Sequence, residues 1–301
     1  KPLILAVAAM ALTAGAQAET KFYGKMNVSL NYSDTDPTLS LVSNASRLGV
    51  KGSEDLGSTK VIYQAEYETA PDDGDATGAG DAIKQRDIYV GLAYADMGTI
   101  KMGVMDTPLK KSQGKFDLFN DVFDMKSVLD GDKRLANSIN YTTTKMGAIQ
   151  ASVSYVMMED ATGVADDGIS ASVVYKSGDI FASVAMDNKT EDADTATVRA
   201  TAIYSMGDMR FGALINNVDA SDTADAELGF ALNASMKMGK NTAKVQYASA
   251  DQSSLGETSL SFGVDHKLAK STKAYAYINL EDADAAGSDK TKAAFGLEHK
   301  F

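Results

Sequence analysis

Cysteine and tryptophan are absent from the 301 residues, and the sequence has only two histidines and four prolines. Without cysteine, the protein is stabilised without disulfides. His266 and His299 have no neighbouring serine and acid that would form a catalytic triad. No phosphate-binding glycine-rich loop or metal-ligand cluster is visible either. These absences argue against an enzyme, and we expect no cofactor and no metal.

Long apolar runs and positive charge are also lacking. After residue 18, no stretch reaches 18 consecutive apolar residues, so the sequence predicts no membrane-spanning helix. The formal net charge is −12, whereas nucleic acid binding needs a basic face. Acidic runs at residues 72–75, 191–194 and 281–284 lack the spacing of a calcium-binding loop. We therefore expect solvated surface loops there, and no nucleic acid partner.

The first residues have the pattern of a secretory signal peptide. Lys1 precedes a small-residue apolar segment from Leu3 to Ala14, and residues 16–18 form an A-x-A cleavage site. The starting methionine of this pattern is missing. We expect residues 1–18 to be removed and residues 19–301 to form a single β-barrel domain.

From Lys21 onward, apolar and polar residues alternate along segments of about ten residues. In the first segment, Phe22, Met26 and Leu30 are separated by polar neighbours such as Lys25. This alternation predicts strands with one apolar and one polar face. The sixteen predicted strands are residues 22–32, 46–53, 60–68, 87–95, 99–105, 134–143, 148–156, 169–176, 180–187, 198–206, 209–215, 228–238, 243–249, 259–268, 272–280 and 293–301.

The connections alternate between short turns and longer loops rich in Asp, Gly, Ala and Thr. Short turns on one rim and long loops on the other are typical of an outer-membrane β-barrel. An even number of strands also puts both chain ends on the short-turn rim, where the first and last strands can pair. A soluble β-sandwich would show the same alternation, but it rarely needs so many strands in one domain.

One connection, residues 107–133, is far longer than the others. Structureless connections beyond roughly 12 to 15 residues are uncommon and usually functional. If this segment forms two helical turns, three phenylalanines share one side and three aspartates share another. These residues are Phe116, Phe119 and Phe123, and Asp117, Asp121 and Asp124. An exposed loop has little use for the phenylalanines, so we expect the loop to fold into a wide barrel.

Several motifs occur in a characteristic order and spacing. They are residues 46–57 (SRLGVKGSEDLG), 87–92 (DIYVGL), 103–108 (GVMDTP), 114–117 (GKFD) and 134–141 (RLANSINY). The chain thereby resembles the general diffusion porins of Gram-negative outer membranes over nearly all of its mature length. The resemblance implies a trimeric, water-filled barrel of sixteen strands, narrowed by its third long loop. The closing residues, which end in Phe301, are similar to the signal by which the insertion machinery recognises such barrels.

Charged residues are expected on both sides of the narrowest part of the pore. Counting from the apolar face puts several cations on the inward side of the strands, opposite the acidic loop. The expected basic wall consists of Lys25, Arg47, Lys60 and Arg134, and the expected acidic loop residues are Asp117, Asp121 and Asp124. Many family members carry arginine where this chain has Val104, and Lys101 is a candidate replacement. A basic wall that faces an acidic loop predicts an electric field across the pore, and this field selects solutes by charge and polarity.

The prediction is therefore an all-β protein, a 16-stranded antiparallel transmembrane β-barrel with an inward-folded third long loop, in the bacterial outer membrane. Its expected function is passive diffusion of small hydrophilic solutes and ions. Expected partners are two further copies in a homotrimer, lipopolysaccharide and outer-membrane lipid, and the insertion machinery. Two alternatives stay open: a substrate-preferring porin with a binding track in its lumen, and a plugged structural or adhesive barrel.

Overall fold

The computed structural model describes residues 18–72, 83–158, 167–190, 195–220, 226–251, 258–282 and 289–301. Residues 1–17 of the expected signal peptide and most of the acidic runs lie outside these residues, whereas Ala18 begins the first strand. The elements are β1 (Ala18–Ser33), β2 (Ser40–Ser43), β3 (Ser46–Asp55), β4 (Thr59–Thr69), β5 (Ile83–Tyr94), β6 (Gly98–Asp106), α2 (Pro108–Ser112), the 3-10 helix η1 (Met125–Ser127), β7 (Arg134–Thr142), β8 (Ile149–Val156), β9 (Gly168–Ser177), β10 (Ile180–Asn188), β11 (Thr195–Met206), β12 (Met209–Ala220), β13 (Glu227–Met238), β14 (Asn241–Ala250), β15 (Thr258–Ala269), β16 (Thr272–Asp282) and β17 (Lys290–Lys300).

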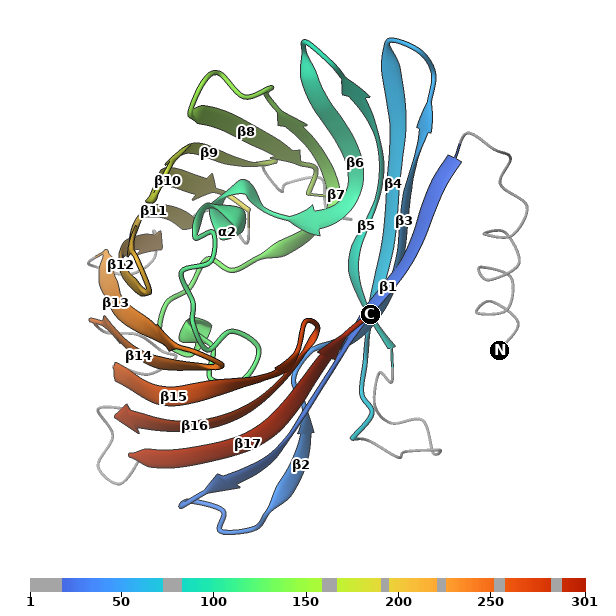
Figure 1. The fold of residues 1–301 in the computed structure, drawn as a ribbon. Coiled ribbons are helices and arrows are strands. Elements are labelled where there is room, and N and C mark those ends of the chain that lie inside the picture. Colours follow the sequence, from blue (N-terminus) through green and yellow to red (C-terminus); the bar gives the residue numbers. More distant parts are fainter. Residues whose placement is uncertain are drawn as a thin grey trace.

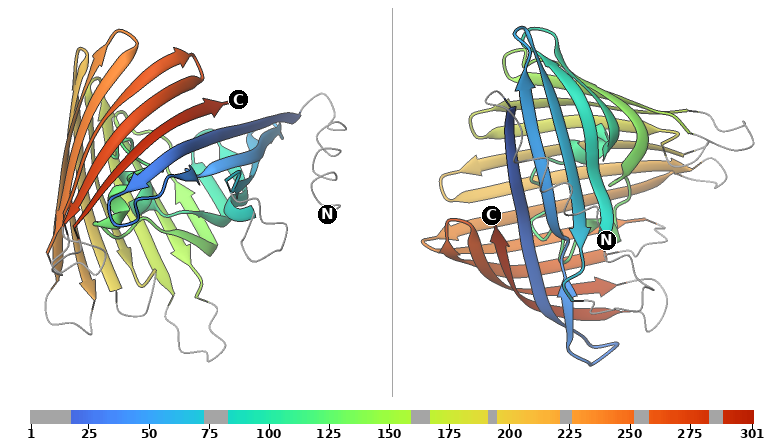
Figure 2. Two further views of the ribbon diagram at one scale, coloured as in Figure 1. Left: turned by 90° about the horizontal axis from the view of Figure 1, so that it is seen from below. Right: turned by 90° about the vertical axis from the view of Figure 1, so that its right-hand side faces the viewer.

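Neighbouring strands pair antiparallel around one closed sheet, and β17 pairs with β1 to close it. β2 and β3 pair with different parts of β1 and together occupy one strand position of the barrel. This strand is interrupted at Ala45, whose φ is 51°. Counted in this way, the barrel has sixteen strands, as predicted. The sequence predicts a connection over residues 33–45, and the structure differs because residues 40–43 pair with residues 28–31 of β1. Seen from the side, adjacent strands join through short turns at one end of the barrel (Figure 2).

The chain end completes the seam between β1 and β17. Gly24 and Phe301 exchange backbone hydrogen bonds of 3.0 and 3.2 Å. The Phe301 ring lies across β1 and leaves no room for a Cβ atom at position 24. The Arg47 carbonyl oxygen, a backbone atom that cannot move aside, lies 2.9 Å from the same Cβ position, so glycine is favoured here.

The two faces of the sheet differ as the alternation predicts. Phe22 and Phe295 point outward and are 58 % and 64 % exposed, whereas the inward Asn27 and Asn279 are 2 % and 0 % exposed. A protein in water would bury its apolar face, but an apolar exterior is stable in lipid. The barrel thus has an apolar outside and a polar inside. In the described part of the chain, no helix has the length and apolarity to cross a bilayer.

The segment between β6 and β7, residues 107–133, runs inside the ring of strands, and we call it the inner loop (Figure 1). It begins with α2, because the Thr107 side chain accepts a hydrogen bond from the Lys110 backbone N–H and Pro108 follows the cap. The helical turns lie at α2 and η1 rather than over residues 116–124. Two-turn helical geometry is therefore wrong for that stretch.

The inner loop supplies most of the apolar core, which lies inside the barrel. Phe116, Met125 and Leu129 pack against Leu214 and other side chains of β11 to β14. A second cluster joins phenylalanines of the loop to the β16 tyrosines: Phe119, Phe123, Tyr275 and Tyr277. Packing against this part of the wall leaves the β1 to β7 side of the lumen facing the loop.

Candidate functional site

Inward side chains of several strands bind the backbone of the inner loop. The Ser183 hydroxyl donates to the Ser112 carbonyl at 2.6 Å, and the Asn233 amide donates to the Phe116 carbonyl at 2.7 Å. The Lys244 ammonium donates to the Leu118 carbonyl at 2.7 Å. A buried loop must satisfy its backbone polar groups, and these donors replace water in that role. They hold the loop against β10 to β14.

The returning half of the loop is held by a buried arginine. Arg199 of β11 is fully buried, pairs with Asp132 at 2.7 Å and donates to the Asp130 carbonyl at 2.6 Å. Asn216 of β12 accepts a further bond from Arg199 and donates to the Asp130 carbonyl. Both halves of the inner loop are therefore attached to the same side of the barrel.

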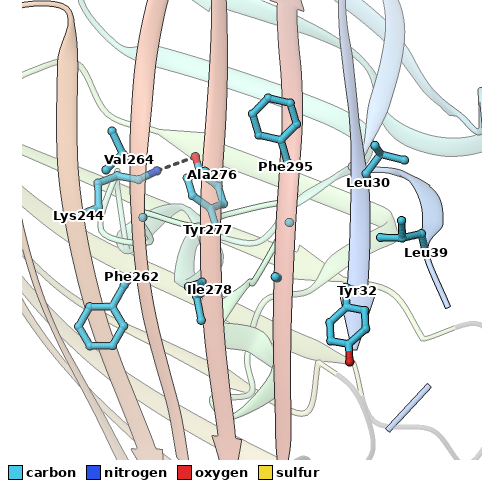
Figure 3. Close-up of a pocket in the computed structure, with 13 residues that line it drawn as sticks. Leu30, Tyr32, Leu39, Lys244, Phe262, Val264, Ala276, Tyr277, Ile278 and Phe295 are labelled. Carbon is cyan, nitrogen blue, oxygen red and sulfur yellow. Dashed lines mark hydrogen bonds between the residues drawn. The ribbon is translucent and has the colours of Figure 1, made fainter. Parts of the chain in front are cut away.

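The wall between β14 and β1 has different chemistry on its two faces (Figure 3). Phe262, Ile278 and Phe295 line the outer part of an apolar groove of about 700 Å³, to which Lys244 and Tyr277 also contribute. On the lumen side, Lys244 and Tyr277 are bonded at 2.8 Å, and Lys244 lies over the Phe119 ring at 4.8 Å. The groove is part of the lipid-facing exterior, whereas the lysine and tyrosine hold the inner loop.

The tip of the inner loop reaches the opposite part of the wall. Asp121, which has a φ of 73°, forms an ion pair with Lys25 of β1 and lies 3.9 Å from Arg47 of β3. Lys25 is only 3 % exposed, so the pair is shielded from bulk solvent. The structure thus brings together three of the residues that the sequence predicts for the site.

The other two loop aspartates have local partners. Asp117 accepts hydrogen bonds from the backbone N–H groups of Phe119 and Met125, and from the Gln246 amide. Burial, with Asp124 nearby, raises the pKa of Asp117 to about 8, although its N–H donors act in the opposite direction. Asp124 caps η1 and pairs with Lys126 at 3.3 Å. Asp117 therefore shapes the inner loop from within.

The arginines of the wall are paired with wall carboxylates. Arg134 of β7 pairs with Asp87 of β5 at 2.7 Å and with Asp106 of β6 at 2.8 Å. Arg47 lies 3.9 Å from Glu66 of β4. Carboxylates on the same wall therefore compensate the positive charges of these arginines.

Sequence reasoning missed a further pairing on this wall. Arg86 of β5 pairs with Glu66 and Glu68 of β4, each at 2.6 Å. A register shift between Ala65 and Tyr67 interrupts the ladder beside it. Because a bulge reverses the side-chain alternation, Arg86 and Asp87 can both face inward. A strict count of alternating positions gives no signal for this pairing.

The remaining predicted cations lie elsewhere on the wall. Lys60 is at the short-turn end of β4, is exposed and lies 3.6 Å from Asp55. Lys101 of β6 lies over the Tyr89 ring at 4.4 Å. Lys111, on α2 of the inner loop, lies among Asp87, Asp106 and Arg134; burial lowers its pKa against the attraction of the two carboxylates. Phe301 lies at the barrel seam.

A closed barrel with an apolar exterior, a polar lumen and a loop folded inside it defines a channel of the outer-membrane type. The sequence profile of the Gram-negative porins matches residues 5–286, and the chain belongs to that family. It is therefore an outer-membrane porin, and a channel rather than an enzyme.

Relatives match the chain along its whole length. Outer membrane porin protein 32 of Delftia acidovorans is 26 % identical, with 99 % of each chain covered. The major outer membrane protein P.IB of Neisseria meningitidis serogroup B is 22 % identical, with 100 % of each covered. Among solved structures, an anion-selective porin from Comamonas acidovorans has a TM-score of 0.80 at 23 % identity, with 95 % of this chain and 100 % of that chain covered. OmpF of Salmonella typhi has a TM-score of 0.78 at 16 % identity, with 94 % and 97 % covered.

Proposed function

We propose that this porin lets small hydrophilic solutes and ions diffuse passively, and that it selects them by size and charge where the inner loop faces the β1 to β7 wall. A barrel of this size has an aqueous lumen too wide to discriminate among small solutes by itself. A loop fixed inside it reduces the open cross-section. Charges at the narrowed level then act strongly, because low-dielectric walls focus their field.

One observation carries this proposal: both halves of the inner loop are attached to one side of the barrel while Asp121 meets Lys25 and Arg47 on the other. The Asp121 contact closes the gap at that point, so the passage lies beside it, where opposite charges of the loop and the wall orient polar solutes and their hydration water. A nonpolar solute gains nothing from this field and must displace ordered water. Size and polarity are thus selected together, without an energy source.

The proposed assembly is a homotrimer in contact with lipopolysaccharide and outer-membrane lipid. Support comes from the apolar exterior and from a solved relative, OmpT of Vibrio cholerae, which is described in a trimer form. We further propose that residues 1–18 are a signal peptide and that residues 19–301 form the single barrel domain. Phe301 is proposed as part of the signal for the insertion machinery.

The test is single-channel conductance and reversal potential of the refolded protein in a planar bilayer under a KCl gradient. Arg47→Ala and Arg134→Ala each remove a wall cation, so their reversal potentials should move toward cation preference. Lys240→Ala, in an exposed turn, is the matched control and should leave the reversal potential unchanged. Arg134 lies 2.7 and 2.8 Å from its two carboxylates, whereas Arg47 lies 3.9 Å from each of its two, so removal of Arg134 should uncover more negative charge and give the larger shift.

The possible results separate the proposal from its alternatives. Open channels with shifted selectivity in both variants support it. Absence of any open channel would favour a plugged structural or adhesive barrel. Solute flux that saturates for one substrate alone would favour a substrate-preferring porin. Open channels with unchanged selectivity would remove these arginines from the site of charge selection.

A further inference from the structure

Four exposed methionines lie on the outer face of the adjacent strands β11, β12 and β13, at the end where short turns join them (Figure 1). Met206 ends β11, Met209 begins β12, and Met236 and Met238 lie at the end of β13. Their side chains are 53 %, 38 %, 43 % and 47 % exposed, in that order. We call these four residues the methionine cluster.

Strand pairing brings three side chains of the methionine cluster into one row. Met206 is directly opposite Met209, and Met209 is directly opposite Met236. Directly opposite residues share a face of the sheet, with Cβ atoms about 4.5–5.5 Å apart. The Lys237 backbone N–H donates to the Asp208 carbonyl at 2.9 Å and ties the β11–β12 turn to β13. Met209 is therefore the centre of the row, with a methionine on each side.

Methionine occurs at only this level of the three strands. The next outward residues, Tyr204 and Phe211, are exposed and directly opposite each other. Aromatic residues in such positions are typical of the boundary between lipid and water. The methionine cluster lies between this aromatic pair and the exposed turn residues Asp208 and Lys240. An ion in the aqueous phase can therefore reach the sulfur atoms.

The chemistry of the thioether group decides which ion suits the row. Methionine has three rotatable bonds and a polarisable sulfur, so neighbouring side chains can turn toward one ion. Hard cations such as Mg²⁺ and Ca²⁺ prefer oxygen ligands, whereas thioethers are among the soft ligands that select Cu(I). A row of neighbouring thioethers thus favours a soft metal ion.

We propose that Met206, Met209 and Met236 form a binding site for a soft monovalent metal ion of the Cu(I) class. Met238 is on the same face of β13, two residues beyond Met236, and supplies a fourth thioether beside the row. The site is on the exterior of the barrel, so this inference goes beyond the proposed function and is independent of selection in the lumen.

The test uses Ag(I), a soft ion with the same charge as Cu(I) that is stable in air. Silver nitrate is added in chloride-free buffer to the refolded protein in detergent, with isotope-labelled methionine methyl groups observed by NMR. The methyl signals of Met206, Met209 and Met236 should shift together and should saturate at about one silver ion per chain. Sodium nitrate supplies a hard monovalent ion and should shift none of these signals.

Leucine variants separate binding from altered structure, because leucine keeps the apolar volume of methionine and removes the sulfur. Met209→Leu removes the central ligand and should weaken silver binding at least about tenfold, since even an outer partner of a metal site is worth that much. Met102→Leu is the matched control. Met102 is exposed on β6 with Val90 and Ile139 directly opposite, and its replacement should leave silver binding unchanged.

Two results would overturn the site: equal shifts of all exposed methionine signals at the same silver concentration, or unchanged silver affinity in Met209→Leu. Channels with wild-type conductance in Met209→Leu, recorded without silver, would establish that this variant is folded. If Met209→Leu forms no channels, Met206→Leu takes its place in the titration, and an unchanged affinity there would equally contradict the proposal.

Discussion

At the residue scale, the three loop aspartates have the same type of side chain but different partners. Asp121 meets cations of the opposite wall, Asp117 accepts bonds from its own loop, and Asp124 caps a helical turn. A carboxylate that accepts backbone N–H groups organises a turn, while one that meets a distant cation fixes a loop against a wall. Sequence spacing alone gives all three the same expected role.

Asp117 should make the docking of the inner loop depend on pH. Its pKa is raised to about 8 in the docked loop, above the usual value near 4, so the docked loop binds a proton that an undocked loop releases. The contribution of Asp117 to docking should therefore be largest below about pH 4 and should weaken as pH rises toward about 8. Asp117→Asn keeps the shape without a titrating group and should remove this dependence.

Open-channel current noise between pH 4 and pH 8 measures this effect, because a loosened loop makes the conductance fluctuate. The wild type should become noisier as pH rises, and Asp117→Asn should not. Asp208→Asn, in an exposed short turn, is the control and should follow the wild type. A pH dependence that persists in Asp117→Asn would contradict this role of Asp117.

Some residue positions follow from the sequence and others do not. Strict alternation gives the outward direction of Phe22 and the inward direction of Lys25, because lipid and water lie on opposite faces of every strand. It fails at Arg86, because the register shift beside it depends on pairing between two strands. The partner of Asp121 was likewise beyond prediction, since it depends on where the loop tip ends in space.

At the scale of elements, the inner loop behaves as a packed structure. It buries phenylalanines on one side and gives its carbonyl groups to donors of the wall. Its length and its phenylalanines predict that it folds inward. Its short helix was not predicted, although Thr107 followed by Pro108 is a recognisable start signal.

Lys244 should be the strongest single attachment of the loop tip. Its ammonium donates to the Leu118 carbonyl, lies over the Phe119 ring and approaches Asp265 at 3.3 Å. Lys244→Met keeps the apolar stem and removes these interactions, at a cost of roughly 1.5–3 kcal/mol for the charged hydrogen bond. We expect faster amide hydrogen exchange over residues 116–123 and greater current noise.

Lys240→Met is the matched control, because residue 240 is exposed in the turn between β13 and β14. In this control, amide hydrogen exchange over residues 116–123 should be as slow as in the wild type. Unchanged exchange over residues 116–123 in Lys244→Met would mean that the remaining wall donors, such as Asn233, hold the tip without the lysine.

At the scale of the whole molecule, closure and the position of the inner loop depend on each other. The barrel closes because β1 pairs with β17, and Phe301 extends that pairing onto Gly24. Lys25, on the same strand, holds the loop tip through Asp121. The seam thus provides both the last pairing of the sheet and one anchor of the loop. The number of strands and the alternation of short turns and long loops follow from local sequence patterns, so the sequence predicts them. The link between barrel closure and the loop tip joins residues far apart in the chain, so the sequence does not predict it.

At this scale, the proposed function requires that the inner loop form the narrowest part of an open pore. Because the protein has no cysteine, one introduced thiol can be modified selectively. Lys126 is suited to this, since its side chain is 63 % exposed on the inner loop. Lys126→Cys can be treated with thiosulfonate reagents of similar size and opposite charge during single-channel recording. Lys240→Cys, in the exposed turn, is the control.

Both reagents should lower the conductance of Lys126→Cys in a single step. The cationic reagent should move the reversal potential toward anion preference, and the anionic reagent toward cation preference. The control should change little with either. If complete modification of Lys126→Cys leaves conductance and reversal potential unchanged, the inner loop does not line the narrowest part of the pore, and selection by size and charge at this loop is contradicted.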